Sequence, residues 1–369
     1  MKTSDFDYQL PAELIAQEPA PRRDQSRLMV LMRQPSAVSR LPSEDPSRQD
    51  PVASTLSPLT SHASPIGHHV FSGLPALVAP SDVVVLNDSR VIPARLLARR
   101  GGGGAAEVLL VTREAGGTWR ALVRPGGRIR AGTTLKLEGD DRIEVVDHLA
   151  AGERRVRLVG PGGDAAVIAR RGRVPLPPYI RREATDLDVE RYQTVFADPP
   201  GSVAAPTAGL HFTPELLAAL EARGVSVARV TLHVGPGTFR PVSAEDPARH
   251  HLDPEAYVVP PAAAEAIAAA RERGGAVWAV GTTVTRTLES CAGPGGTVRP
   301  GAGWTSLFIR PGHIFRVVDH LITNFHLPRS TLLMLVAAFA GREPVLDAYR
   351  EAVERRYRFY SYGDAMAIV

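Results

Sequence analysis

Histidines in loops or at strand ends are the first residues of this sequence whose types suggest chemistry. They are His211, His233, His250 and His326. Histidine exchanges a proton near neutral pH, so these side chains suit acid–base work. A single histidine in such a place is more often a structural hydrogen-bonding group. A zinc site is a competing interpretation, but the sequence has no H-E-x-x-H and no close histidine pair on a helix.

The stretch from Gly201 to Phe239 places two of these histidines in neighbouring loops. The loop 206–212 leads into an expected helix that Thr213 caps. An alternating run follows over 225–233 and ends in the glycine-rich loop 235–238. Buried scaffolds do not need such a gathering of turn residues and histidines, whereas a small-molecule site does.

Two glycine-containing loops, 235–237 and 281–283, allow a ligand to approach the backbone closely. The alternative is that they are tight turns alone. The sequence contains no G-x-G-x-x-G after a strand and no G-x-x-x-x-G-K-[ST], so dinucleotide and P-loop sites are disfavoured.

The elements that position these loops alternate between helix and strand after residue 165. Expected helices cover 214–224, 261–275 and 345–357, a further helix follows Ser330 or Thr331, and expected strands cover 276–280, 307–309 and 315–318. This alternation predicts an α/β domain with a mostly parallel sheet. Ligands of such sheets bind beyond the carboxyl ends of the strands, where the polar loops lie.

Residues 87–165 differ in pattern and predict an inserted small antiparallel β-barrel domain. Short alternating runs recur there without a helical period. The expected strands are 95–99, 106–112, 118–123, 134–138, 142–146 and 154–159. The α/β domain then consists of residues 1–86 and 166–369, interrupted by a loop over 34–65. That loop holds eight Ser, six Pro and no aromatic residue, so we expect it to be disordered.

Composition limits the class of protein. A single cysteine, Cys291, excludes an internal disulfide and fits a reducing compartment, and the net charge of +4 permits an anionic partner. The apolar run 332–340 is too short to span a membrane, and the N-terminus does not resemble a secretory signal. We therefore expect a cytoplasmic protein that does not bind membranes.

Arginines are dense in the first half of the chain and around the expected barrel. They form either an ordinary solvated surface or a face that contacts phosphates. The C-terminal segment 357–362 alternates aromatic residues with Arg358, which suits base stacking or, more simply, core packing. The candidates for contact with nucleic acid are Arg90, Arg95, Arg124 and Arg358.

Nine motifs, in order along nearly the whole chain except 34–65, carry a resemblance to a known family. They are Phe6-Asp-Tyr-Gln-Leu-Pro11, Asn87-Asp-Ser-Arg-Val-Ile-Pro-Ala-Arg-Leu96, Pro175-Leu-Pro-Pro-Tyr-Ile180, Tyr192-Gln-Thr-Val195, Ala204-Ala-Pro-Thr-Ala-Gly-Leu-His-Phe212, Val230-Thr-Leu-His-Val-Gly235, Ala279-Val-Gly-Thr-Thr283, Val318-Asp-His-Leu-Ile-Thr-Asn-Phe-His-Leu-Pro328 and Tyr357-Arg-Phe-Tyr-Ser-Tyr-Gly-Asp-Ala-Met366. The sequence resembles the S-adenosylmethionine:tRNA ribosyltransferase-isomerase (QueA) family of queuosine biosynthesis.

The resemblance implies transfer and isomerisation of the ribosyl part of S-adenosylmethionine onto 7-aminomethyl-7-deazaguanine at the tRNA wobble position. The products would be epoxyqueuosine-tRNA, adenine and methionine. S-adenosylmethionine is then a consumed substrate, and no metal or further cofactor is implied. The partners are this substrate and tRNA, and we expect a monomer.

The sequence differs from the family at one motif, which in the family reads His-x-x-His-x-Glu-aromatic. Here the corresponding residues are His250-His-Leu-Asp253-Pro-Glu255. The glutamate is kept as Glu255, whereas Asp253 stands in place of the second histidine. We expect Glu255 or His233 to act as the base and His211 or His326 to lie near adenine. The remaining residues expected to bind the substrate are Pro206, Thr207, Gly209, Gly235, Gly237, Thr238, Gly281, Thr282, Thr283, Thr323 and Asn324.

Two other classes stay open at this point. A hydrolase that uses the same loops without tRNA would not need a basic, aromatic C-terminus. A tRNA-binding module without catalysis would tolerate loss of His211 and Glu255.

Overall fold

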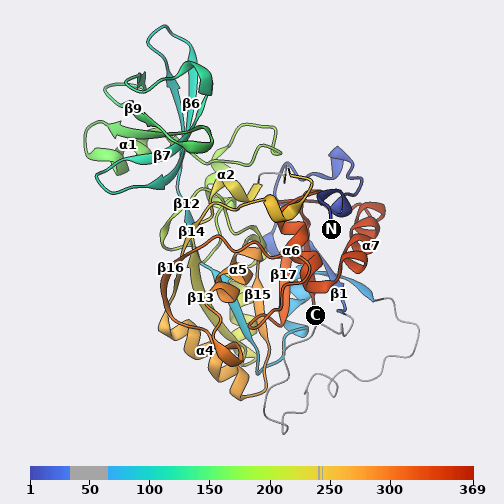
Figure 1. Ribbon diagram of the computed structural model, residues 1–369. Coiled ribbons are helices and arrows are strands. Elements are labelled where there is room, and N and C mark those ends of the chain that lie inside the picture. The colour runs from blue at the N-terminus through green and yellow to red at the C-terminus, as the bar shows by residue number, and fades with distance from the viewer. Residues whose placement is uncertain (34–64, 240–241, 243) are drawn as a thin grey trace.

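A nine-stranded sheet forms the larger of two bodies in this computed structural model, which describes residues 1–33, 65–239, 242 and 244–369 (Figure 1). A smaller β-barrel stands apart from the sheet at the upper left of that view. In spatial order the strands of the sheet are β16 (Gly301–Thr305), β14 (Glu255–Val259), β13 (Ser226–Leu232), β3 (Val83–Asn87), β15 (Val277–Val280), β17 (His320–Asn324), β18 (Ala365–Ile368), β1 (Arg27–Leu31) and β2 (Ile66–Val70).

The sheet is mixed, so the expectation of a mostly parallel sheet is wrong. Four neighbouring pairs are parallel and four are antiparallel. The parallel strands β13, β3, β15 and β17 lie side by side in the centre. At one edge β14 returns against β13 without a described α-helix between them, and a parallel pairing would need such a crossover.

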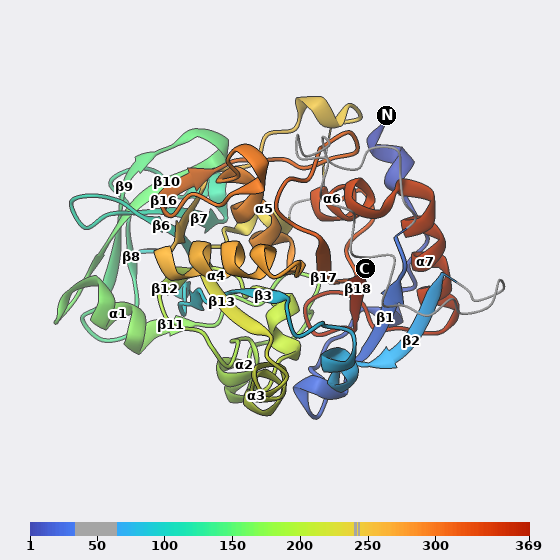
Figure 2. The ribbon, with the colours of Figure 1, turned by 90° about the horizontal axis from the view of Figure 1, so that it is seen from below.

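Helices cover both faces of the sheet, as Figure 2 shows with the strands seen between them. Val83 and Val85 of β3 belong to one apolar cluster, whereas Val84 and Leu86 belong to another. Successive side chains of a strand point to opposite faces, so a strand covered on both sides is apolar throughout. The first cluster packs against α4 (Pro261–Glu272), α5 (Thr282–Ser290), α6 (Thr331–Ala340) and α7 (Arg342–Glu354), and the second packs against α3 (Pro214–Ala222).

The helices begin after the expected capping residues. The Thr213 hydroxyl accepts a hydrogen bond from the Leu216 amide at 3.1 Å, and Ser330 does the same for Leu333 at 3.1 Å.

Two expected strands, 307–309 and 315–318, are irregular instead. The strands of this region are β16 and β17, so Thr323 and Asn324 end a strand at the centre of the sheet.

The barrel is antiparallel and closed, as expected. Its strands are β5 (Arg95–Arg99), β6 (Ala105–Arg113), β7 (Trp119–Arg124), β10 (Glu153–Val159), β9 (Arg142–His148) and β8 (Thr134–Lys136), and pairing of β8 with β5 closes it. The short strand β11 (Gly172–Arg173) extends β5, and α1 (Gly163–Arg171) adds Val167 and Ile168 to the apolar core. The expected domain limits at residues 87 and 165 stay a prediction.

Short elements join the two bodies. Strands β4 (Arg90–Val91) and β12 (Pro200–Ser202) pair in parallel, and α2 (Asp186–Arg191) follows the barrel. The expected disordered loop falls almost wholly on 34–64, outside the described residues. No helix in the described part of the chain is long and apolar enough to cross a membrane.

Candidate active site

A pocket with an empty volume of about 370 Å³ opens at the carboxyl ends of the central strands β15 and β17. We call it the threonine pocket. It includes eight of the residues expected to form a site, together with four apolar residues that the sequence did not single out. Its lining residues are Ala205, Pro206, Thr207, Ala208, Val234, Gly281, Thr282, Thr283, Thr323, Asn324, His326 and Leu332.

The N-terminus of α5 forms one wall of the threonine pocket. Gly281 precedes the helix with φ of 96°, a conformation that favours glycine. The first amides of a helix have no partners within it and carry partial positive charge, so this wall suits a carboxylate. Asn87, at the end of β3, donates to the Leu232 carbonyl at 3.0 Å and to the Thr283 hydroxyl at 3.3 Å. It thereby fixes α5 against β13.

Asn324 presents an unused acceptor at the end of β17. Its amide nitrogen donates to the carbonyls of Tyr360 at 3.1 Å and Asp364 at 3.4 Å, and to Nε2 of His211 at 3.1 Å. Carbonyls only accept, so these contacts fix the orientation of the amide. Its Oδ1 is buried and has no partner among the described residues. A ligand that donates a hydrogen bond would satisfy it.

Burial keeps His211 neutral. Because Nε2 of His211 accepts from Asn324, its proton lies on Nδ1, which donates to the Ser26 hydroxyl at 2.6 Å. Burial lowers the pKa of His211 to about 3, and the positive charges of Arg23 and Arg358 act in the same direction.

His326 lies in the threonine pocket and is neutral for the same reason. Its Nε2 is 2.7 Å from the Thr323 hydroxyl, and burial lowers its pKa to about 3. Near neutral pH both His211 and His326 are therefore neutral rings.

Glu255 is buried beside the pocket rather than in its lining. Its carboxylate forms an ion pair with Arg286 of α5, and its other oxygen accepts a hydrogen bond from the Gly235 amide at 2.8 Å. Arg286 also donates to the Leu307 carbonyl at 2.9 Å. Sequence reasoning missed Arg286, although an arginine inside the buried helix 282–290 was a visible signal.

Four further expected residues, His233, Gly235, Gly237 and Gly209, are not among those that line the pocket. His233 follows β13; its Nδ1 is buried without a described partner, and burial lowers its pKa. Gly235 precedes a turn at 236–239, and a Cβ at Gly237 would lie 3.1 Å from the Asp253 carboxylate. Gly209 packs against Thr194 and Phe196, which accounts for a glycine there without a ligand. The Thr238 side chain lies outside the described part of the structure.

A family model described as queuosine biosynthesis protein matches residues 3–45 and 41–368. The chain belongs to this family. It is 52% identical over 375 residues to an S-adenosylmethionine:tRNA ribosyltransferase-isomerase of Anaeromyxobacter sp. (strain Fw109-5), covering 100% of this chain and 99% of the relative. It is 49% identical over 371 residues to the protein of that name from Pelotomaculum thermopropionicum, covering 100% of both.

A solved member of the queuosine biosynthesis family has a related structure. The crystal structure of an S-adenosylmethionine tRNA ribosyltransferase from Thermotoga maritima matches with a TM-score of 0.53 and 40% identity, over 99% of this chain and 100% of that one. The expected resemblance to the family is thus confirmed.

Within this family member, the arginines expected to contact nucleic acid differ in how their charge is used. Arg95 pairs with Glu107 at 2.8 Å, Arg90 donates to the carbonyls of Ala197 and Asp198, and Arg358 donates to the Glu18 carbonyl. Arg124 is exposed at the end of β7 and has no ion pair among the described residues. Of these four, Arg124 has the side chain most available to a partner.

The described residues contain no group of three or more His, Cys, Asp or Glu side chains that could hold a metal ion. The polar groups of the threonine pocket are instead hydroxyls, an amide and a neutral imidazole. Such groups bind an organic ligand through hydrogen bonds.

Proposed function

We propose that the protein is an S-adenosylmethionine:tRNA ribosyltransferase-isomerase. It would transfer and isomerise the ribosyl moiety of S-adenosylmethionine onto 7-aminomethyl-7-deazaguanine at the wobble position of tRNA. The products would be epoxyqueuosine-tRNA, adenine and methionine, with no metal or further cofactor. The observation that carries the proposal is the threonine pocket, in a chain whose full-length relatives bear this name.

The chemistry of the threonine pocket suits S-adenosylmethionine. A sulfonium ion is a permanent cation, and none of the lining residues carries a positive charge while His326 is neutral. The ribose needs hydrogen-bonding partners for its hydroxyls, which Thr207, Thr323 and Oδ1 of Asn324 supply. The methionine carboxylate would lie at the N-terminus of α5, beside Thr282 and Thr283.

The first chemical step removes a proton from the 5′ carbon, which the adjacent sulfonium makes acidic. Glu255 and His233 are the candidate bases, and we place Glu255 first because it is a buried carboxylate held beside Val234 and Gly235. Because Glu255 is paired with Arg286, this ion pair would have to open for the carboxylate to accept the proton. His326 would contact adenine as a neutral hydrogen-bonding group.

The test is to incubate the purified protein with S-adenosylmethionine and tRNA that carries the aminomethyl-deazaguanine. We expect equal amounts of adenine, methionine and the modified nucleoside, and no reaction with tRNA that has guanine at that position. Adenine release without tRNA would identify a hydrolase instead. Tight binding of tRNA without any product would identify a binding module.

We also propose that the protein is a cytoplasmic monomer. Sedimentation would test the oligomeric state, and cell fractionation would test the location.

A further inference from the structure

A second pocket, with an empty volume of about 270 Å³, is lined in part by His211. We call it the arginine pocket. The side chains that matter here are Arg23, Ser26, Arg191, His211, Ser361 and Tyr362. His211 joins the two pockets, because it lines this one and accepts a hydrogen bond from Asn324 of the threonine pocket.

The two arginines of this pocket have no carboxylate partner among the described residues. Arg23 donates to the backbone carbonyls of Leu210 at 3.3 Å and Glu190 at 3.0 Å. Arg191 donates to those of Ala20 at 2.7 Å and Pro21 at 3.2 Å, and its Nε is buried without a partner. Carbonyls hold the guanidinium groups in place but do not neutralise their charge.

The positive charges oppose each other in a partly buried place. Burial lowers the pKa of Arg23, and the charge of Arg191 lowers it further, while Glu190 opposes the shift. Burial also lowers the pKa of Arg358, and the charge of Arg358 helps to keep His211 neutral. An anion in the pocket would relieve this repulsion.

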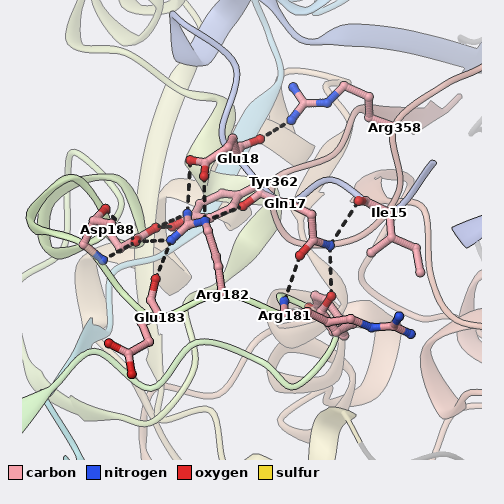
Figure 3. A network of polar contacts seen from close by, with 11 residues as sticks. Ile15, Gln17, Glu18, Arg181, Arg182, Glu183, Asp188, Arg358 and Tyr362 are labelled. Atoms are coloured by element: carbon pink, nitrogen blue, oxygen red, sulfur yellow. Dashed lines mark hydrogen bonds and ion pairs between the residues drawn. The ribbon is translucent and has the colours of Figure 1, made fainter. Parts of the chain in front are cut away.

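Two carboxylates of this region, those of Asp188 and Glu18, are already engaged with Arg182, as the network in Figure 3 shows. Arg182 pairs with Asp188 at 2.6 Å and with Glu18 at 2.7 Å. Asp188 also accepts the Tyr362 hydroxyl at 2.7 Å, which fixes one wall of the pocket. Their charges therefore do not compensate Arg23 and Arg191.

We propose that the arginine pocket binds a backbone phosphate of the tRNA, next to the nucleotide whose base reacts in the threonine pocket. Guanidinium groups recognise phosphate oxygens through paired N–H donors, which Arg23 and Arg191 would supply. This inference rests on the proposed function. The competing source of an oxyanion is the methionine carboxylate of S-adenosylmethionine.

The test compares Arg23→Gln and Arg191→Gln with Arg223→Gln, which removes one positive charge from an exposed residue at the end of α3. Affinity for tRNA is measured between low and high salt, together with KM for each substrate. Each pocket variant should raise KM for tRNA about tenfold and reduce the slope of log affinity against log salt by roughly 0.7–0.9. KM for S-adenosylmethionine and the behaviour of Arg223→Gln should match the parent.

Unchanged tRNA affinity and salt slope in both pocket variants would overturn the inference. A rise in KM for S-adenosylmethionine alone would also overturn it, and would assign the pocket to the methionine carboxylate. If the glutamine variants do not fold, Arg23→Lys and Arg191→Lys keep the charge but lose the paired donors. They should retain the salt slope and still bind tRNA several-fold more weakly than the parent.

A separate measurement distinguishes failure of this inference from failure of the proposed function. Inorganic phosphate should raise the melting temperature of the parent protein, and raise it less in Arg23→Gln and Arg191→Gln. That result would hold even if the parent releases no adenine. An equal shift in the parent and the variants would show that the pocket does not bind phosphate.

Discussion

The threonine pocket and the arginine pocket have separate linings and differ in charge. One is lined by hydroxyls, an amide and a neutral imidazole, and the other holds two arginines that form no ion pair with a described carboxylate. The pockets meet at the hydrogen bond between Asn324 and His211. A cation is repelled by the second pocket and tolerated by the first, whereas a phosphate is attracted by the second. The difference thus sorts a sulfonium substrate from a polyanionic one.

The neutral state of His211 is part of this arrangement. A protonated ring would add a third charge beside Arg23 and would lose the hydrogen bond that it accepts from Asn324. The same ring therefore limits positive charge next to Asn324 and orients the Asn324 amide. We therefore propose that His211 orients Asn324 and does not act as an acid.

The largest expected effect tests whether the reaction takes place at the threonine pocket, beside Glu255. Glu255→Gln should reduce turnover by roughly two to four orders of magnitude, the usual effect of removing a general base. Binding of S-adenosylmethionine and tRNA should change little. Single-turnover kinetics and equilibrium binding would measure these quantities separately.

This substitution also leaves Arg286 buried without its partner, which costs stability by about 3–5 kcal/mol. The double variant Glu255→Gln/Arg286→Gln removes both charges and serves as the control. It should recover much of the lost stability without recovering the rate. Near-parental turnover in the double variant would exclude Glu255 as the base and favour His233.

A second prediction concerns acid stability, because the buried histidines are neutral. Their pKa values of about 3 lie below the ordinary value of 6.5, so the unfolded chain binds more protons between these limits. Their contribution to stability is therefore present above pH 6.5 and is lost as the pH falls. For each of the two histidines, the free energy of unfolding should fall by roughly 1 kcal/mol per pH unit below pH 6.5.

The measurement is denaturant unfolding between pH 6.5 and 4.5. His326→Asn should flatten the loss of stability on acidification, while His69→Asn, at an exposed position, should not. An identical slope in His326→Asn and the parent would mean that His326 takes up its proton as readily in the folded protein as in the unfolded chain. The threonine pocket would then not differ from the arginine pocket by holding a neutral histidine.

The barrel was the part of the fold most open to sequence reasoning. Its runs at 95–99 and 142–146 coincide with β5 and the first part of β9, because strands covered on one face alternate clearly. Strand β17 was missed because burial on both faces removes that alternation. The antiparallel edge was missed because strand order depends on pairing between distant segments.

The threonine pocket was partly predictable, and the arginine pocket was not. Turn residues such as Gly281 and Thr283 stand out beside apolar strands, so a site at the strand ends could be inferred. Arg23 and Arg191 are 168 residues apart in the sequence numbering and resemble ordinary surface arginines. Only the fold shows that they face one pocket without carboxylate partners.

A smaller effect is expected for Thr207→Val in the threonine pocket. The Thr207 hydroxyl has no hydrogen bond to another described residue, so its loss should not weaken the fold. Loss of one hydrogen bond to the ribose should raise KM for S-adenosylmethionine about fivefold to tenfold. KM for tRNA and the salt slope should stay at parental values, as should every parameter of Thr134→Val in barrel strand β8. A change in tRNA affinity alone would mean that Thr207 contacts tRNA and not S-adenosylmethionine.

The smallest effect concerns Arg124, and it compares the barrel with the arginine pocket as contacts for tRNA. Several barrel arginines pair with acids, including Arg120 with Glu153 at 2.6 Å and Arg155 with Glu114 at 2.7 Å. Arg124 has no such ion pair among the described residues, yet it is exposed, so water and salt screen its charge.

Arg124→Gln should therefore weaken tRNA binding only about threefold, less than Arg191→Gln, because exposed charge pairs contribute little. Fluorescence anisotropy with labelled tRNA at fixed salt would compare the two variants directly. A larger effect for Arg124→Gln would mean that tRNA is held chiefly by the barrel. The unpaired charges of Arg23 and Arg191 would then need another explanation, and the division of substrates between the two pockets would lose its main support.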